Sequence, residues 1–337
     1  AEVLMAISNV LTQLLGVEHP IVLAPMDLVA DAQLTLAVSQ AGGFGFLGAG
    51  YGDVAWLERE LAILSRSDAR LQQPFGVGFI TWSLARQPHL LDRALAAKPR
   101  AIWLSFGNPE PFVRSVKDAG ALLVCQVQNV QMAIDAVAKG ADVVVAQGGE
   151  AGGHGISQGS FTLIPAVVDA IGAQVPVLLA GGAADGRGLA AAIMLGALGI
   201  AIGTRFYASL EAAGHEKAKQ RIVSASGDET ARSIIFDVSR QNVWPHPFTG
   251  RCLTNRHTER WFGRELELMR REDVIAEFAR ARQIGDFEIA PVVAGEAVAL
   301  VRDIPSAQEI VRRTAVEAEG LLGHASQSIA TQRPAAA

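Results

Sequence analysis

The sequence predicts an α/β protein that folds as a (β/α)8 TIM barrel with a helical C-terminal appendage. Eight short apolar runs recur between residues 20 and 204, and amphipathic segments separate them. The runs are continuously apolar rather than alternating, as in parallel strands buried on both faces. Eight strands with intervening helices have the size and order of a closed barrel. A doubly wound open sheet is the competing architecture, and the count of eight favours the barrel.

The predicted strands and helices follow one another in strict alternation. Segments such as DAQLTLAVSQAG and NVQMAIDAVAKGA, which lie between strands, place Ala, Leu, Val and Ile at helical spacing. Four predicted helices end in a glycine where a left-handed C-cap is expected, namely Gly42, Gly120, Gly140 and Gly196. The strands are predicted at residues 20–26, 43–48, 75–80, 101–106, 121–126, 142–148, 175–182 and 198–204.

The alternation occupies residues 16–206, which we predict to be the barrel core. Beyond it, residues 206–226 and 264–284 are predicted helices, and the segment between them, with VWPHPFTGRCLTN, is predicted to be irregular. We therefore expect residues 207–324 to form a mainly helical appendage near the barrel mouth.

Two further features complete the C-terminal region. Residues 304–322 have helical periodicity, with Ser306 as the candidate N-cap. The tail ASQSIATQRPAAA, residues 325–337, is predicted to be disordered because it has few residues that could join a core.

Composition excludes several classes of protein. Half of the 337 residues are hydrophobic and 19% are charged, which suits a globular protein with a large core. A net charge of −5 and the lack of any basic run longer than two residues argue against nucleic-acid binding. The two cysteines, Cys125 and Cys252, suit a reduced protein without disulfides, and no Cys/His spacing indicates a metal site.

The sequence also indicates a cytoplasmic location. Its first 20 residues lack the positive region and cleavage site of a signal peptide. The longest uncharged run lies between Arg187 and Arg205, and its glycines divide it into a helix and a buried strand. We therefore expect no transmembrane segment and no membrane partner.

Glycines follow the last two predicted strands, at the face where barrel active sites lie. AGGAADGRG follows the seventh strand and GTRF the eighth. The backbone N–H groups of Gly181, Gly182, Gly203 and Thr204 could form a phosphate cradle, with Asp185 capping the helix that follows. The alternative is that these glycines only make tight turns.

AQGGEAGGHG, residues 146–155, follows the sixth predicted strand at the same face. Its five glycines leave room for a flat ligand against the main chain. His154 is the only side chain there suited to proton transfer near neutral pH, and a structural histidine bonded to loop carbonyls is the alternative. For Glu150 we expect a structural role, in which its carboxylate accepts backbone N–H bonds.

These motifs together resemble the nitronate monooxygenase family, formerly called 2-nitropropane dioxygenases, which are FMN-dependent barrel enzymes. The matching segments occur in the right order over residues 16–206, with a weaker match in the C-terminal helix. They are HPIVLAPM, AGGFGFLGAG, PFGVGF, AQGGEAGGHG, PVLLAGGAADGRG and GIAIGTRF. The combination is specific for this wider group of flavoproteins and less specific for the reaction.

The resemblance implies a cofactor site and a reaction. FMN would be the cofactor and no metal would be needed. An alkyl nitronate or nitroalkane would be oxidised with O2 to a carbonyl compound and nitrite, and His154 would position the nitronate or take a proton from the nitroalkane. A homodimer is left open. The FMN-binding residues implied are Ala24, Pro25, Met26, Gln126, Gly152, Gly153, Gly181, Gly182, Gly203 and Thr204.

The chain departs from the family pattern at three of these strand ends. Asp27 follows APM where small or hydroxyl residues are usual, and it would disfavour an anionic substrate if it points inward. Gly78 replaces a polar amide, and Gln126 replaces a basic residue of some related flavin reductases. Phe79, Trp82 and Trp103 are candidates for apolar walls, although Trp103 is expected to belong to the core.

Two rival functions stay open at this point. One is an NAD(P)H-dependent FMN reductase of quinones or enoyl thioesters on the same barrel. GGFGFLGAG is only a weak match to a dinucleotide fingerprint, because it follows a helix instead of opening one. The other is a non-enzymatic binder of flavin or phosphate, which would require His154 to be turned away from the site.

Overall fold

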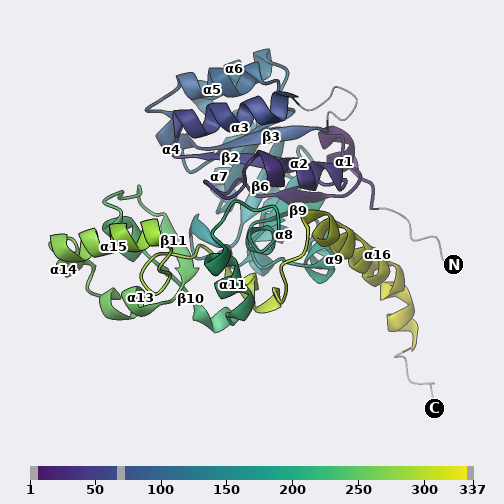
Figure 1. Cartoon of the computed structure of the whole chain (residues 1–337). Helices are drawn as coiled ribbons and strands as arrows, with labels where there is room; N and C mark the ends of the chain where they lie inside the picture. The colour runs from purple at the N-terminus through teal and green to yellow at the C-terminus, as the bar shows by residue number, and fades with distance from the viewer. Residues whose placement is uncertain (1–6, 67–72, 332–337) are drawn as a thin grey trace.

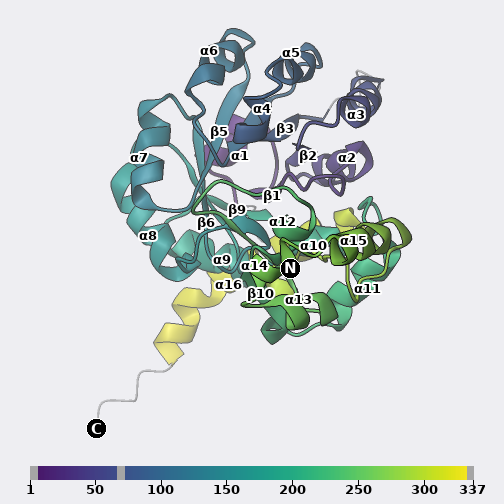
Figure 2. The same ribbon diagram turned by 90° about the vertical axis from the view of Figure 1, so that its left-hand side faces the viewer.

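A computed structural model describes residues 7–66 and 73–331. Its main sheet has eight parallel strands in the order β1-β9-β8-β6-β5-β4-β3-β2. The sheet closes between its edges, because the N–H of Phe44 donates to the carbonyl of Ile21 and the N–H of Leu23 donates to that of Phe44, both at 2.9 Å. The end-on view shows helices around the barrel (Figure 2). The predicted (β/α)8 barrel is confirmed.

All eight predicted strands are present, each within two or three residues of its expected bounds. The barrel strands are β1 (Ile21–Leu23), β2 (Gly45–Gly50), β3 (Phe75–Ile80), β4 (Ala101–Ser105), β5 (Leu122–Val127), β6 (Val143–Gln147), β8 (Val177–Ala180) and β9 (Gly199–Ile202). The four glycines predicted as left-handed C-caps all have positive φ, between 73° and 97°.

The helices of the barrel are amphipathic, and their apolar faces pack on the outer surface of the sheet. Asp185 caps α9 by accepting from the N–H groups of Arg187 and Gly188, as predicted. The helices in this part of the chain are α1 (Val10–Leu15), α2 (Ala32–Gln40), α3 (Val54–Arg66), α4 (Thr81–Leu84), α5 (His89–Ala96), α6 (Glu110–Asp118), α7 (Val130–Ala138), α8 (Ser160–Ile171), α9 (Gly186–Met194) and α10 (Thr204–Tyr207).

The barrel interior is filled by side chains and does not form a channel. Phe46 packs edge-on against Trp103, with ring centroids 5.1 Å apart, and Leu11 and Leu15 of α1 join the same cluster. Trp103 is 1% exposed, so its predicted place in the core is confirmed. This packing leaves only the opposite end of the barrel, where the carboxyl ends of the strands lie, free to hold a ligand.

The C-terminal helix α16 (Ala307–Thr331) packs against α9 and α2, in the place of the barrel's eighth helix (Figure 1). The N–H of Glu309 donates to the Ser306 hydroxyl, so the predicted N-cap is confirmed. The helix continues through residues 325–331, the first part of the tail predicted to be disordered, because ASQSIAT contains no proline or glycine to end it. The rest of that tail, residues 332–337, lies outside the described residues.

The region between α10 and α16 covers the barrel mouth and contains more strand than the sequence indicates. Its strands β10 (Thr230–Ser233) and β11 (Thr249–Leu253) pair in antiparallel fashion with each other, and β11 pairs with β7 (Gly153–Gly155). Its helices are α11 (Glu216–Ser224), α12 (Ile235–Ser239), α13 (Arg256–Trp261), α14 (Glu265–Leu268) and α15 (Glu272–Ile284). The prediction of an irregular insert was therefore wrong at β10, α12, β11 and α13, because these elements are short and are stabilised only by pairing and packing in the fold. No helix in the described residues is long and apolar enough to cross a membrane.

Candidate active site

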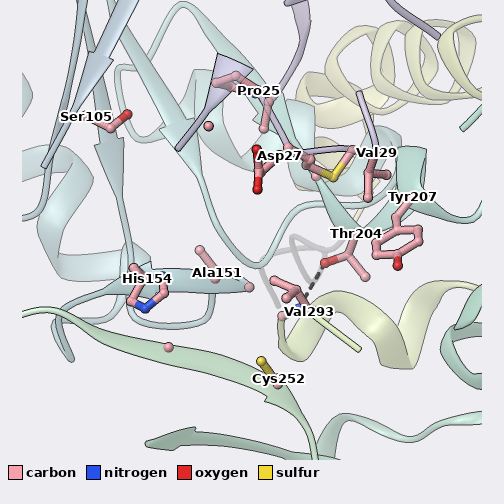
Figure 3. A pocket seen from close by; sticks show the side chains of 18 of the residues that line it. Pro25, Asp27, Val29, Ser105, Ala151, His154, Thr204, Tyr207, Cys252 and Val293 are labelled. Carbon is pink, nitrogen blue, oxygen red and sulfur yellow. Dashed lines mark hydrogen bonds between the residues drawn. The ribbon is translucent and has the colours of Figure 1, made fainter. Parts of the chain in front are cut away.

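A cavity of about 390 Å³ opens at the carboxyl ends of the barrel strands, under the appendage. Its volume is in the range typical of small-molecule sites. The barrel supplies one part of its wall, and α12, β11, α15 and the segment around Val293 supply the rest (Figure 3). All eleven residues predicted to act in the site line it: Ala24, Pro25, Met26, Gln126, Gly152, Gly153, His154, Gly181, Gly182, Gly203 and Thr204. Their individual roles remain predictions.

His154 is the middle residue of β7, an edge strand of the three-stranded sheet, and lies opposite Gly250 of the central strand β11. Its Nε2 lies 2.9 and 3.0 Å from the two carboxylate oxygens of Asp237, a residue of α12. Both side chains are buried, with 10% of His154 and 5% of Asp237 exposed. An ionised carboxylate only accepts hydrogen bonds, so Asp237 fixes the proton of the neutral imidazole on Nε2.

This tautomer makes Nδ1 the basic nitrogen of His154. Nδ1 has no hydrogen-bond partner among the described residues. Burial lowers the pKa of His154 below its ordinary value, and Asp237 offsets part of that effect. The imidazole is therefore neutral at pH 7 and can accept a proton there.

Trp244 covers one face of the His154 ring. The two rings are parallel within 6°, with centroids 3.4 Å apart. The indole N–H of Trp244 donates to the hydroxyl of Tyr51 at 2.9 Å, and Phe106 and Trp82 pack edge-on against the indole. This aromatic cluster fixes the orientation of the imidazole and excludes water from its covered face.

A row of amides runs from β5 to the histidine. Gln147, at the end of β6, accepts from the side-chain amides of Gln126 and Gln128 at 2.8 and 2.9 Å. Its own amide donates to the backbone carbonyl of His154 at 2.9 Å. Ser105 donates to Gln126 at 3.2 Å, so the orientation of each amide is set by a neighbour. Gln126 is thereby presented to the cavity in a defined orientation.

Two arginines of the neighbouring strands β10 and β11 bind the carbonyl groups of the glycine loop, residues 148–155. Arg232 donates to the carbonyls of Gly149 and Ala151 at 3.1 Å, and Arg251 donates to that of Gly149 at 3.0 Å. Burial, followed by the charge of Arg251, lowers the pKa of Arg232 to about 10. The Glu150 carboxylate accepts from the N–H and hydroxyl of Ser160, so its predicted structural role is confirmed.

The glycines of this loop are needed first for contacts within the chain. A Cβ at Gly152 would lie 2.7 Å from the backbone of both Ala294 and Gly295, and one at Gly149 would lie 2.7 Å from the carbonyl of Ser157. These distances are shorter than real Cβ contacts, and the atoms met are backbone. Close packing of the loop against its neighbours is therefore a second reason for the glycines, beside the flat ligand that we predicted.

Gly182, after β8, and Gly203, after β9, face open space instead, whereas a Cβ at Gly181 would lie 3.0 Å from the backbone nitrogen of Ala151. A Cβ at Gly203 would meet only Met26 Sδ at 3.6 Å and Ala24 Cβ at 3.8 Å, and one at Gly182 would meet only Glu150 Cβ at 3.9 Å. Within the described chain, the N–H groups of Gly182, Gly203 and Thr204 donate to no protein acceptor. Free donors around an open recess fit the phosphate of FMN. The hydroxyl of Thr204, in contrast, already accepts from the N–H of Gly295.

Asp27 lies across the cavity from His154 (Figure 3). Gly50 faces it, and a Cβ at Gly50 would overlap the carboxylate, so the position of Asp27 depends on this glycine. Burial raises the pKa of Asp27 to about 6, while the Tyr51 N–H, Arg240 and Arg282 act in the opposite direction. Asp27 does point into the site, as the sequence left open.

The remaining predicted wall residues differ in role. Phe79 is 3% exposed and lines the cavity, while Trp82 does not line it and packs against Tyr51 and Trp244. Gly78 is explained by Pro25, whose ring would lie 2.3 Å from a Cβ there. A larger side chain at position 78 would collide with this proline.

Sequence reasoning missed several residues of the site. Gln147 could have been found, because it ends a predicted strand at the active face, as Gln126 does. Asp237 and Trp244 are 83 and 90 positions from His154 in a region without strand–helix alternation, and no local pattern connects them to it. The contacts of Arg232 and Arg251 with the loop could not be predicted for the same reason, since only the pairing of β10, β11 and β7 brings these residues to it.

Comparison with known proteins agrees with this geometry. The sequence profile of the family described as "Nitronate monooxygenase" matches residues 8–83 and 83–316. A protein of Metarhizium robertsii named nitronate monooxygenase npaC is 36% identical, over 90% of this chain and 92% of its own length.

Two further relatives carry other names. A (3aS,4S,5R,7aS)-5-hydroxy-7a-methyl-1-oxo-octahydro-1H-indene-4-carboxyl-CoA dehydrogenase of Mycobacterium tuberculosis is 34% identical, over 69% of this chain and 65% of its own length. The solved structure of FabK from Thermotoga maritima superposes with a TM-score of 0.82 at 29% identity, covering 95% of this chain and 99% of that one. The fold is thus common to proteins with different reactions.

Proposed function

The chain belongs to the nitronate monooxygenase family of flavin-dependent oxidoreductases, and we propose that it uses FMN and O2 to oxidise alkyl nitronates to a carbonyl compound and nitrite. We include neutral nitroalkanes among its substrates. The observation that carries this proposal is the contact between His154 and Asp237, which prepares a base in the wall of a cavity that also has free backbone N–H donors.

His154 acts as a general base toward the nitroalkane. Its Nδ1 takes the proton from the carbon next to the nitro group, and the electrons of that C–H bond form the C=N bond of the nitronate. The imidazolium that results is stabilised by the Asp237 carboxylate, 2.9 Å from Nε2. A nitronate supplied from solution needs no such proton transfer.

The residues present fit FMN. The N–H groups of Gly182, Gly203 and Thr204 would hold its phosphate, and Ala24, Pro25, Met26 and Gln126 would line the ring system. When bound, FMN supplies the electron acceptor and the route to O2 that no protein side chain provides. The protein contributes orientation, a largely apolar wall and a base whose tautomer is fixed.

An NAD(P)H-dependent reductase of quinones or enoyl thioesters is the second candidate. Two observations favour it. One relative is named as a carboxyl-CoA dehydrogenase, and the side chains of Arg240 and Arg282 line the cavity without a hydrogen-bond or ion-pair partner among the described residues, as a phosphate-bearing substrate would require. Both candidates place the same base beside the same flavin.

Anaerobic mixing of the flavin-loaded protein with a nitronate and, separately, with NADH or NADPH distinguishes these functions. We expect the nitronate to bleach the flavin absorbance and the pyridine nucleotides to leave it unchanged. Bleaching by a pyridine nucleotide alone would overturn the first proposal in favour of the second. A protein that does not retain added FMN would overturn both.

A further inference from the structure

Arg240 and Arg282 differ from the other arginines near the cavity. Arg240 follows α12, Arg282 lies in the last turn of α15, and both line the cavity. Neither guanidinium makes a hydrogen bond or an ion pair with any described residue, and Nε of Arg240 is buried without a partner. In contrast, Arg251 pairs with Glu296 at 2.9 Å, and Arg232 donates to loop carbonyls. A partly buried guanidinium without an acceptor is costly unless a ligand supplies one.

The two guanidinium groups also repel each other. Burial lowers the pKa of Arg282, and the charge of Arg240 lowers it further, which places the two cations within electrostatic range. Asp27 is the carboxyl group that both of them face. Asp237, the other carboxylate of this wall, is already bonded to His154. Both cations therefore line the cavity with Asp27 as the carboxyl group that they face in common.

We propose that Arg240, Arg282 and the protonated carboxyl of Asp27 form a subsite for a phosphate monoester that the substrate or a second substrate carries at a distance from the reacting carbon. The proposal rests on the proposed function, because it assumes that the chemistry takes place at His154. A phosphate monoester has three terminal oxygens, and the subsite offers one donor group for each of them. Arginine is the side chain best suited to bind such oxygens in pairs.

Proton uptake by Asp27 follows from this arrangement. The groups that face Asp27 are Tyr51 and Asp53 from the turn after β2, together with Arg240 and Arg282. At pH 7 the carboxyl is mostly ionised and would repel the incoming anion, since its pKa is about 6. Protonation removes that repulsion and supplies a donor, so anion affinity falls as pH rises through 6.

Calorimetric titration of the flavin-loaded protein with inorganic phosphate and with sulfate tests the subsite without relying on turnover. We expect Arg240→Gln and Arg282→Gln each to weaken binding of both anions at least tenfold. Arg280→Gln, at an exposed position of α15 that does not line the cavity, is the matched control and should change the affinity by less than twofold. Equal affinity in all four proteins would overturn the proposal.

Sulfate does not titrate between pH 5 and 8, so any proton taken up when it binds is taken up by the protein. At pH 7, titrations in two buffers of different ionisation enthalpy should show uptake of most of one proton per sulfate, and Asp27→Asn should abolish it. No uptake by the unaltered protein would overturn the role of Asp27. A tenfold loss of FMN affinity in Arg240→Gln would also overturn the proposal, since the arginines would then bind the phosphate of FMN.

Comparing ligands that differ only in one phosphate group identifies the molecule that carries the phosphate. A preference for NADP⁺ over NAD⁺ that disappears in Arg240→Gln would assign it to a dinucleotide, and a preference for coenzyme A over its dephospho form would assign it to a thioester. If the anions bind as expected but no nitronate is oxidised, the subsite stands and the proposed reaction fails. If a nitronate is oxidised but neither anion binds, the reaction stands and the subsite fails.

Discussion

Two glycine-rich stretches border the same cavity, and they are glycine-rich for different physical reasons. The loop between β6 and α8 packs closely against other parts of the chain. A Cβ added at Gly149 or at Gly152 would lie 2.7 Å from backbone atoms of another segment, which leaves no room for a side chain. Arg232 and Arg251 bind its carbonyls, so the loop is held before any ligand arrives.

Two glycines that follow β8 and β9 lack such neighbours. Gly182 and Gly203 face open space, and their N–H groups have no acceptor within the described chain. Where other protein atoms fill the space that a side chain would occupy, close packing explains the glycine. Gly182 also has a positive φ of 76°, and the open space beside Gly182 and Gly203, which both line the cavity, leaves room for a ligand. This difference separates glycines that the fold requires from glycines that leave space for a ligand.

The largest effect is expected at the packed loop. Gly152→Ala places a Cβ 2.7 Å from the peptide bond between Ala294 and Gly295, so the free energy of unfolding should fall by about 3 kcal/mol. Gly320→Ala in α16, where no atom lies within 4 Å, is the control and should be neutral or stabilising. Chemical denaturation of both variants measures the difference, and equal stability would mean that the loop is not packed as described.

A smaller effect on turnover is expected from the dyad that the loop presents. Asp237→Asn removes the carboxylate that fixes the tautomer of His154, so kcat for a nitroalkane should fall by roughly 10²-fold. The same carboxylate raises the pKa of His154, so the acid limb of the pH profile should move to lower pH. An unchanged pH profile and rate would show that the pair is only structural.

Asp27→Asn tests, through the pH dependence of the free energy of unfolding, whether the Asp27 carboxyl is buried in the cavity as described. Because the pKa of Asp27 is raised in the folded state, its ionisation destabilises the fold as pH rises from about 4 through 6. The variant should therefore be more stable than the parent by about 3 kcal/mol at pH 8 and no more stable at pH 4. Thermal unfolding at the two pH values gives the comparison, and an advantage that does not depend on pH would contradict it.

The smallest effect is expected at the open cradle. Gly203→Ala adds a methyl group in ordinary contact with Met26, so the stability of the flavin-free protein should stay within about 0.5 kcal/mol. The same methyl group occupies the space for the phosphate, and FMN affinity should fall about tenfold, or 1.4 kcal/mol. Fluorescence titration with FMN provides the measurement. Unchanged affinity would remove this glycine from the phosphate site.

The parts that sequence could predict are those with a local signal. Continuous apolar runs determine the eight strands, and glycines at helix ends have their left-handed conformation whatever surrounds them. His154 and Gln126 were found because barrel chemistry is confined to strand ends. Asp237, Trp244 and Arg232 reach the site through antiparallel pairing and helix placement far along the chain, which no local pattern encodes.

The central claim is that Asp237 holds His154 as a base, and comparison of two forms of one substrate tests it most directly. Anaerobic flavin reduction by nitroethane and by its preformed nitronate should be measured in the parent and in His154→Ala, with bound FMN quantified in both. We predict that FMN stays bound and that the rate with nitroethane falls by roughly 10²-fold, while the nitronate loses far less. An equal loss with both forms would contradict the claim, because His154 would then bind the anion and not remove the proton.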